Sequence, residues 1–206
     1  MRLAAVAWLC LGVGAAAADS SVPAAAAAST DSAAACERAL RAMAAHEFAD
    51  WQPLPAECPL AVPRRLFGAP GDFREGGRLG SARVPLGYSF TGQIGGFPDG
   101  GGYWLAGNRI VAINIETGRT ELTLAALRAA LKEPDVTLDW QAASIKSATR
   151  GGHSTSSCRR GELVYARLGI SVFSCGGELQ YLLIYPPTTV AEYKRALRPN
   201  LYRNLH

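Results

Sequence analysis

Residues and motifs on which enzymes and metal proteins commonly depend are scarce in this chain. Its 206 residues include three histidines and three lysines, and no two cysteines stand in a Cys-x-x-Cys pair. A Gly-x-Ser-x-Gly nucleophile elbow, a Walker loop and a Gly-x-Gly-x-x-Gly dinucleotide motif are also missing. The sequence therefore predicts no metal, no cofactor and, in our leading hypothesis, no enzymatic activity.

Charge is also sparse, at 18% of residues, and the formal net charge is a mild +4. Nucleic-acid partners require a strongly basic surface, so we expect none. Apolar residues make up 49% of the chain, which is enough for a folded core. Eighteen arginines beside three lysines, in a chain rich in alanine, are typical of a GC-rich genome, and we expect a bacterial source.

Long apolar runs are confined to the N-terminus, so the sequence predicts no transmembrane segment. Arg2 is followed by an apolar run over 3–13 and by small residues at 16–18. This order is typical of a secretory signal, and we predict a signal peptide over 1–18 and a periplasmic or secreted protein. Cys10 follows a leucine rather than a small residue, which argues against lipidation.

Four cysteines follow the predicted signal peptide: Cys36, Cys58, Cys158 and Cys175. An even number in an exported chain predicts disulfides, because the compartments outside the cytosol are oxidising. Three pairings are possible, and we favour the local pairs Cys36–Cys58 and Cys158–Cys175. A β-hairpin between the members of the second pair would bring them close together.

Apolar spacing and turn residues divide the rest of the chain into helices and strands. Residues 19–35 are alanine, serine and threonine with almost no bulky apolar side chain, so we expect a flexible leader. Over 36–206 we expect a single α+β domain, an antiparallel sheet with short helices packed on one face. Helices are predicted over 36–49, 60–67, 123–131 and 189–197, and strands over 83–90, 109–115, within 136–147, and over 162–168, 170–175 and 178–185.

Two helical segments echo each other at a spacing of 64 residues. The matching positions are Leu60 with Leu124, Arg64 with Arg128, Phe67 with Leu131, and Pro70 with Pro134. Further along the chain, 107–115 resembles 176–184. Two explanations stay open: a duplicated structural unit with halves 36–116 and 117–206, or chance similarity between short capped helices.

Four features, taken together, carry a resemblance to known families. They are the segments 66–70 and 131–134, which end the two helices, the strands of 162–185, and the paired cysteines. With these features the chain resembles the small extracytoplasmic modules of outer-membrane assembly lipoproteins. It is also similar to the secreted β-lactamase inhibitor proteins, which double such a module and place a disulfide in each half. The resemblance implies helices on an antiparallel sheet and, by analogy, a protein-binding role. Lys132 departs from the pattern, since glycine would be expected after the helix.

The best candidate for a binding surface is the glycine-rich segment 97–104, Phe-Pro-Asp-Gly-Gly-Gly-Tyr-Trp. Aromatic side chains supply much contact area at a low entropic cost, and glycine lets a loop adapt to a partner. We therefore predict that Phe97, Tyr103 and Trp104 contact another exported protein. The alternative is that Tyr103 and Trp104 begin a strand and point into the core.

Catalysis has a weaker candidate, His153, which is followed by serines and a threonine. A histidine can activate a serine if a carboxylate orients it, but small polar residues are the usual composition of an exposed loop. Paired carboxylates could cleave a glycosidic bond. The pairs Asp135 with Asp139 and Glu116 with Glu121 stand where turns and strand ends commonly place such residues.

Three functions follow as hypotheses. The leading one is a non-enzymatic binding protein, an inhibitor or immunity factor, whose partner is another exported protein. The others are a hydrolase that uses His153 and a structural accessory protein of the cell envelope.

Overall fold

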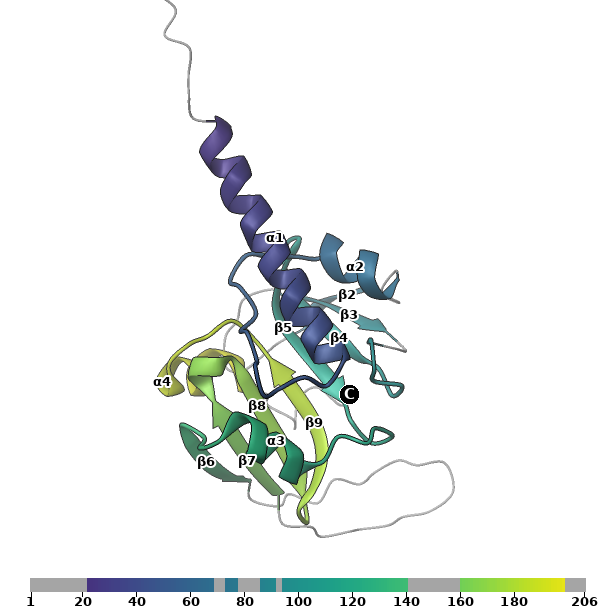
Figure 1. Cartoon of the computed structure of the whole chain (residues 1–206), viewed down its shortest axis with the longest axis vertical. Coiled ribbons are helices and arrows are strands. Elements are labelled where there is room, and N and C mark those ends of the chain that lie inside the picture. Colours follow the sequence, from purple (N-terminus) through teal and green to yellow (C-terminus); the bar gives the residue numbers. More distant parts are fainter. Residues whose placement is uncertain (1–21, 69–72, 78–85, 92–93, 141–159, 199–206) are drawn as a thin grey trace, which may run out of the picture.

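The computed structural model describes residues 22–68, 73–77, 86–91, 94–140 and 160–198. These residues form a nine-stranded antiparallel sheet with helices packed against it (Figure 1). Eight strands follow the order β2-β3-β4-β5-β9-β8-β7-β6, and the two-residue strand β1 pairs with β5. The predicted α+β class and the antiparallel sheet are confirmed.

Most elements lie where the residue pattern predicts them. The helices are α1 (Val22–Ala44), α2 (Ala61–Phe67), α3 (Leu124–Leu131) and α4 (Val190–Glu192), which continues as the π-helical turn η2 (Tyr193–Leu197). The strands are β1 (Cys58–Pro59), β2 (Phe73–Gly77), β3 (Leu86–Thr91), β4 (Gly101–Ala106), β5 (Arg109–Glu116), β6 (Val136–Trp140), β7 (Arg160–Tyr165), β8 (Ile170–Cys175) and β9 (Glu178–Ile184). A short 3₁₀ turn, η1 (Ala166–Leu168), separates β7 from β8. Thr123 and Thr189 stand where the helices over 123–131 and 189–197 are predicted to begin, and they cap α3 and α4, because their hydroxyls accept hydrogen bonds from the backbone N–H groups of Ala126 and Glu192.

Strand β2, in the glycine-rich part of the chain, was not predicted, and β4 matches the alternative in which Tyr103 and Trp104 begin a strand. β4 begins two residues earlier, at Gly101, where its backbone runs very close to β5. A Cβ atom on Gly101 would lie 1.9 Å from the carbonyl oxygen of Asn114. Glycine at this position therefore marks a close approach of two strands rather than a loop.

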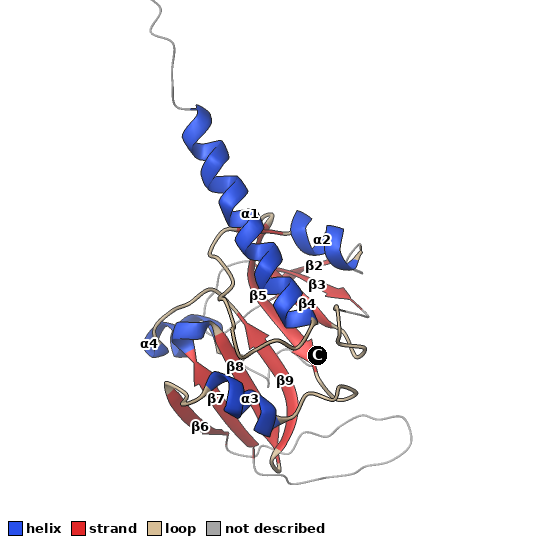
Figure 2. Cartoon of the chain, viewed as in Figure 1, coloured by secondary structure: helices blue, strands red, loops and turns tan. Residues whose placement is uncertain are grey.

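The leader over 19–35 differs from the prediction, because the described residues 22–35 belong to α1 (Figure 2). Alanine has the highest helix propensity of all residues. The costly first turn of a helix is already formed where α1 packs from Cys36 onward, so the helix can extend outward from there. Figure 1 shows that its N-terminal part projects beyond the sheet.

Three helices, α1, α2 and α3, lie on one face of the sheet (Figure 2). Side chains such as Leu40 of α1 and Leu127 of α3 form one core with that face. The C-terminal helix departs from the predicted one-sided packing. Tyr193 belongs to a second cluster, on the opposite face, as the strand alternation from Leu182 to Leu183 indicates. Both faces of the sheet are therefore packed.

The strand order is symmetric about the pair β5–β9, which we call the seam. On each side of it a helix is followed by four antiparallel strands, α2 with β2 to β5 and α3 with β6 to β9. The seam itself runs from Ile113 opposite Ile184 to Glu116 opposite Tyr181. The last strands of the two halves thus join them into one sheet.

The hairpin β4–β5 has the same register as the hairpin β8–β9. Gly101 faces Ile115 in the first hairpin and Ile170 faces Ile184 in the second, so corresponding residues are 69 positions apart. All the paired residues of the two hairpins keep this spacing. The two hairpins therefore share one backbone arrangement.

Irregularities of the two hairpins also coincide. The register shifts directly after Trp104 in β4 and directly after Phe173 in β8, again 69 positions apart. Each turn contains a glycine with a φ of 61°, Gly107 in the first hairpin and Gly176 in the second. A left-handed φ favours glycine at such positions, since other residues clash there.

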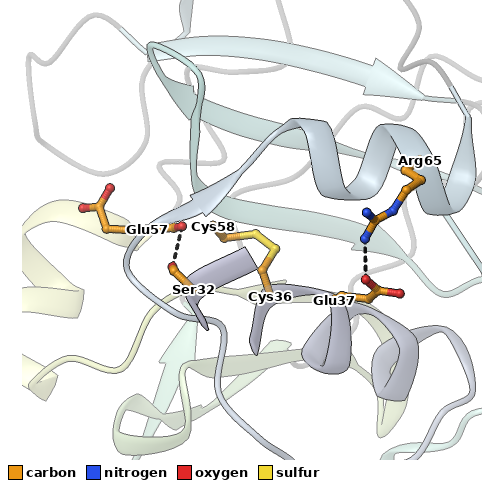
Figure 3. Close-up of a disulfide and its surroundings, with 6 residues drawn as sticks. All are labelled: Ser32, Cys36, Glu37, Glu57, Cys58 and Arg65. Carbon is orange, nitrogen blue, oxygen red and sulfur yellow. Dashed lines mark hydrogen bonds and ion pairs between the residues drawn. A yellow bond between two sulfur atoms is a disulfide. The ribbon is translucent and has the colours of Figure 1, made fainter. Parts of the chain in front are cut away.

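The disulfide Cys36–Cys58 is formed as predicted and ties α1 to β1 (Figure 3). Its two Cα atoms are 5.3 Å apart, and both cysteines are fully buried. Beside it, the hydroxyl of Ser32 donates a hydrogen bond of 2.7 Å to the carbonyl oxygen of Glu57 (Figure 3). The bridge holds α1 against the sheet in the first half of the chain.

An ion-pair cluster adds a contact between α1 and α2. Glu37 of α1 accepts hydrogen bonds from Arg41 on the same helix and from Arg65 on α2 (Figure 3 shows the contact with Arg65). These guanidinium groups, Arg41 first, lower the pKa of the Glu37 carboxyl. All three side chains are reached by solvent, so the cluster orients the two helices more than it stabilises them.

Candidate functional site

The three aromatic residues predicted to bind a partner are buried in the two cores. Phe97 and Tyr103 are 0% and 2% exposed and lie in the core beneath the helices. Trp104, the next residue along β4, is 8% exposed and lies in the second cluster, on the opposite face. Phe97 and Tyr103 therefore offer a partner almost no surface, and the burial of Tyr103 and Trp104 in β4 agrees with the alternative that they belong to a strand and point into the core.

Some of the residues predicted to form the second disulfide or to act in catalysis lie outside the described residues. Cys175 is disulfide-bonded, whereas Cys158, its predicted partner, lies outside the described residues. His153 also lies outside them, so its proposed role as a catalytic base stays a prediction.

His46 lies just after the C-terminal end of α1. Its backbone has a left-handed φ of 59°, and its backbone N–H donates a hydrogen bond to the carbonyl oxygen of Met43. The imidazole ring lies 4.7 Å from the ring of Phe97, and its Nε2 atom is buried without a hydrogen-bond partner among the described residues. This environment makes His46 a packing residue at the helix end.

A row of four side chains crosses the second face of the sheet at the seam. Register places Glu162 of β7 opposite Phe173 of β8, Phe173 opposite Tyr181 of β9, and Tyr181 opposite Glu116 of β5. Directly opposed residues of antiparallel strands share a face, so the four form a continuous line, which we call the acidic–aromatic row. The rings of Phe173 and Tyr181 stack, with centroids 4.0 Å apart and planes inclined by 14°.

One end of the row, Glu162, is fully buried and already has its partners. The hydroxyl of Tyr193 donates to Oε1 at 2.6 Å, and Nε of Arg198 donates to Oε2 at 2.8 Å. A buried carboxylate needs such partners, because an unpaired charge in a protein interior is very costly. The ion pair therefore fastens the C-terminal segment to the sheet.

A second pair of hydroxyls supports this end of the row. The hydroxyls of Tyr185 and Ser171 lie 2.9 Å apart, and the ring of Tyr185 stacks on that of Tyr193, with centroids 5.1 Å apart. Burial raises the pKa of both tyrosines above the ordinary value. They act here as neutral hydrogen-bonding groups.

The middle of the row contains a hydroxyl with an unmade hydrogen bond. The hydroxyl oxygen of Tyr181 is buried and has no partner among the described residues. Burial, followed by the negative charges of Glu162 and Glu116, raises the pKa of Tyr181. An unsatisfied buried hydroxyl costs about 1–3 kcal/mol, so its presence calls for an explanation.

The other end of the row, Glu116, lies at the rim and is exposed to solvent. Nδ2 of Asn114, two residues earlier on β5, donates to its Oε1 at 3.4 Å. Partial desolvation by the surrounding residues, with a smaller contribution from the negative charge of Asp99, raises the pKa of Glu116. Among the described residues, this carboxyl has no cationic partner of the kind that Glu162 has in Arg198.

The described part of the chain offers neither a metal-binding cluster nor a membrane-spanning helix. No cluster of three or more histidine, cysteine or acidic side chains there could hold a metal ion. None of the described helices combines the length and the apolar character that a membrane crossing requires. Asp135, a candidate for acid–base chemistry, accepts hydrogen bonds from both the backbone N–H and Nε of Arg167.

Comparison of the chain with protein-family models, curated proteins and solved structures gives no match.

The acidic–aromatic row was not predicted from the sequence. Phe173 and Tyr181 lay in predicted strands with no assigned role, and Glu116 was one carboxylate of a candidate pair. The available signal is the strand alternation, which separates Glu162 and Tyr181 from the apolar residues that face the helices. That signal does not say which strands are neighbours, and the row exists only because β5 pairs with β9.

Proposed function

We propose that this protein is an exported, non-enzymatic binding protein that acts as an inhibitor or immunity factor for another exported protein. The proposed contact is the exposed end of the acidic–aromatic row, around Tyr181 and Glu116. The observation that carries the proposal is the buried hydroxyl of Tyr181 without a hydrogen-bond partner among the described residues. A partner that displaced the atoms covering this hydroxyl and supplied the missing hydrogen bond would recover its cost on binding.

The scaffold around the row supports this proposal. Tyr181 stands on a central strand of the sheet and stacks on Phe173, so its side chain is held in place before binding. The disulfide Cys36–Cys58 restrains the helical side of the same domain. Preorganised aromatic and charged groups lose little entropy on binding, which is the feature that distinguishes binding hot spots.

The test is capture of a partner from cell-envelope extract by the immobilised wild-type protein and by the variant Tyr181→Ala. The matched control is Gln180→Ala, which changes the exposed neighbour on the same strand. Circular dichroism and thermal melting first establish that both variants are folded. We expect the wild type and Gln180→Ala to retain one protein in stoichiometric amount, and Tyr181→Ala to lose at least about tenfold in affinity for it.

Retention of that protein by folded Tyr181→Ala at wild-type affinity would remove the row as the contact. Failure of the wild type to bind any envelope protein stoichiometrically would contradict the binding function itself.

A further inference from the structure

We infer that the group bound at Tyr181 and Glu116 is an arginine side chain presented by an exposed segment of the partner protein. This inference rests on the proposed function and names the chemistry of its contact.

The first argument is the distribution of charge along the row. Its two carboxylates, Glu162 and Glu116, flank the stacked rings, three strand spacings or about 14 Å apart. Glu162 is matched by Arg198 from within the chain. Glu116 has the neutral amide of Asn114 as its described hydrogen-bond donor, so its charge is the one that a partner can still match.

The second argument is the pairing of two acceptors. Tyr181 and Glu116 are directly opposed across the seam, and opposed Cβ atoms in a sheet lie about 4.5–5.5 Å apart. A carboxylate has two acceptor oxygens, and a phenol oxygen can accept a hydrogen bond as well. Guanidinium has several N–H donors in one plane and can reach both groups at once, whereas a lysine ammonium acts as a point charge.

The third argument is solvent access. Glu116 is exposed, which lets an incoming cation reach it from the rim. The side chain of Tyr181 is half-buried and its hydroxyl oxygen is buried, so the guanidinium has to displace the atoms that cover this oxygen before it can bind there. The opposed ring of Phe173 excludes water from one side of the tyrosine. A hydrogen bond made there is less weakened by solvent than one on an open surface.

Residues 199–206 of the chain itself are a competing occupant. They follow Arg198, which is bound on this face, and they contain Arg203. The experiment below therefore includes the variant Arg203→Gln in the full exported protein.

The test is a titration of the ¹⁵N-labelled exported protein with the peptide acetyl-Gly-Arg-Gly-amide, followed by NMR. The control peptide carries citrulline, which keeps the shape of arginine without its charge. We expect saturable shifts of the Asn114 side-chain amide and of the backbone amides of Glu116 and Tyr181 with the arginine peptide. The citrulline peptide should bind at least about tenfold more weakly.

Two variants locate the site. Glu116→Gln should weaken binding of the arginine peptide about tenfold, because it removes the charge without removing the side chain. Glu178→Gln removes an exposed carboxylate from β9 and should leave binding unchanged. Equal binding of both peptides, or an equal loss in both variants, would overturn the inference.

Two further outcomes separate this inference from its premise and from its rival. A partner captured equally well by wild type and Glu116→Gln would overturn the arginine contact while leaving the binding function intact. Peptide binding that strengthens tenfold or more in Arg203→Gln would instead assign the site to the chain's own C-terminal residues. Unchanged peptide affinity in that variant supports an occupant from the partner.

Discussion

The hairpins β4–β5 and β8–β9 have the same register, the same bulge and the same turn, but their side chains differ. Ala112 in the first half of the sheet corresponds to Tyr181 in the second half, and Glu116 corresponds to Tyr185. The hydrogen-bond ladder depends on the backbone, so it tolerates different side chains on the same frame. In the second half these positions hold large aromatic residues, whereas in the first half one of them holds a carboxylate at the rim of the sheet. The acidic–aromatic row contains the carboxylate of one half and the aromatic rings of the other, because it crosses the seam.

The comparison also separates positions that the backbone requires from positions that are free to vary. Gly101 and Gly169 lie against the ends of β5 and β9, where a side chain has no room. Tyr181 and Ala112 show that the facing positions accept residues of very different size. The predictions below test this distinction, beginning with the largest expected effect.

The largest effect is expected at the two close approaches of backbone. A Cβ on Gly101 would lie 1.9 Å from the carbonyl oxygen of Asn114, and one on Gly169 would lie 1.9 Å from that of Tyr185. Gly101→Ala and Gly169→Ala should each lower the free energy of unfolding by about 4 kcal/mol, since a carbonyl inside the sheet cannot move aside. Urea unfolding followed by circular dichroism measures the loss.

The matched controls are glycines of the hairpin turns. Gly107 and Gly177 have left-handed φ values of 61° and 89°, but a Cβ on either would meet nothing within 4 Å. Gly107→Ala and Gly177→Ala should therefore cost only about 1 kcal/mol. Similar losses of unfolding free energy in all four variants would show that backbone conformation, and not the space available for a Cβ atom, requires glycine at these positions.

The disulfide comes next in expected size. Cys36 and Cys58 are 22 residues apart in sequence, and a bridge over such a loop stabilises by about 3 kcal/mol in the chain-entropy model. The double variant Cys36→Ala/Cys58→Ala should lose about that much, measured as the guanidinium midpoint of wild type and variant. Hydrogen exchange should accelerate in α1 more than in α3. Equal acceleration in both helices would contradict a bridge that acts on the first half.

A pair of tyrosines distinguishes a satisfied hydroxyl from an unsatisfied one. Tyr193→Phe removes a donor from the buried carboxylate of Glu162 and should cost about 1.5 kcal/mol. Tyr181→Phe removes a hydroxyl that has no described partner and should be neutral or stabilise by up to about 1 kcal/mol. Thermal melting of both variants gives the sign of each change. A loss in Tyr181→Phe as large as in Tyr193→Phe would mean that its hydroxyl is bonded in solution.

The smallest effect is expected where the two helices of the halves end. Gly68 ends α2 and Lys132 ends α3, with φ values of 90° and 63°, and their N–H groups donate to Arg64 and Arg128. Lys132→Gly should stabilise the protein by about 1 kcal/mol, because glycine adopts a positive φ without strain. The reverse change, Gly68→Lys, should destabilise by a similar amount. Opposite shifts in melting temperature are the expected result, and shifts of the same sign would contradict it.

Much of the fold follows from local patterns in the sequence. The helix over 123–131, the hairpin strands over 170–175 and 178–185 and the bridge Cys36–Cys58 were all predicted from local patterns of residues. A cap or a hairpin is decided by a few consecutive residues, so their chemistry is readable directly. Strand β2 and the start of strand β4 were not predicted, because glycine is common both in loops and in strands that approach each other closely.

The candidate site was less predictable than the fold. Phe97 and Tyr103 have the composition of a binding loop, yet the packing of α1 and of the sheet buries both. Tyr181 and Glu116 were not predicted to form a joint site, because they lie 65 positions apart in the chain. Contacts between distant strands depend on the whole sheet, which no local window contains.

Sequence alone thus determined the α+β class and the positions of most helices and strands, because residues close together in the chain decide them, and it favoured the first disulfide among three possible pairings. Only the tertiary structure decided that β5 lies beside β9, that the C-terminal helix covers the second face, and that two carboxylates flank two stacked rings across four strands. The physical reason is that strand pairing over long separations is selected by the packing of all the side chains together, after the local elements have formed.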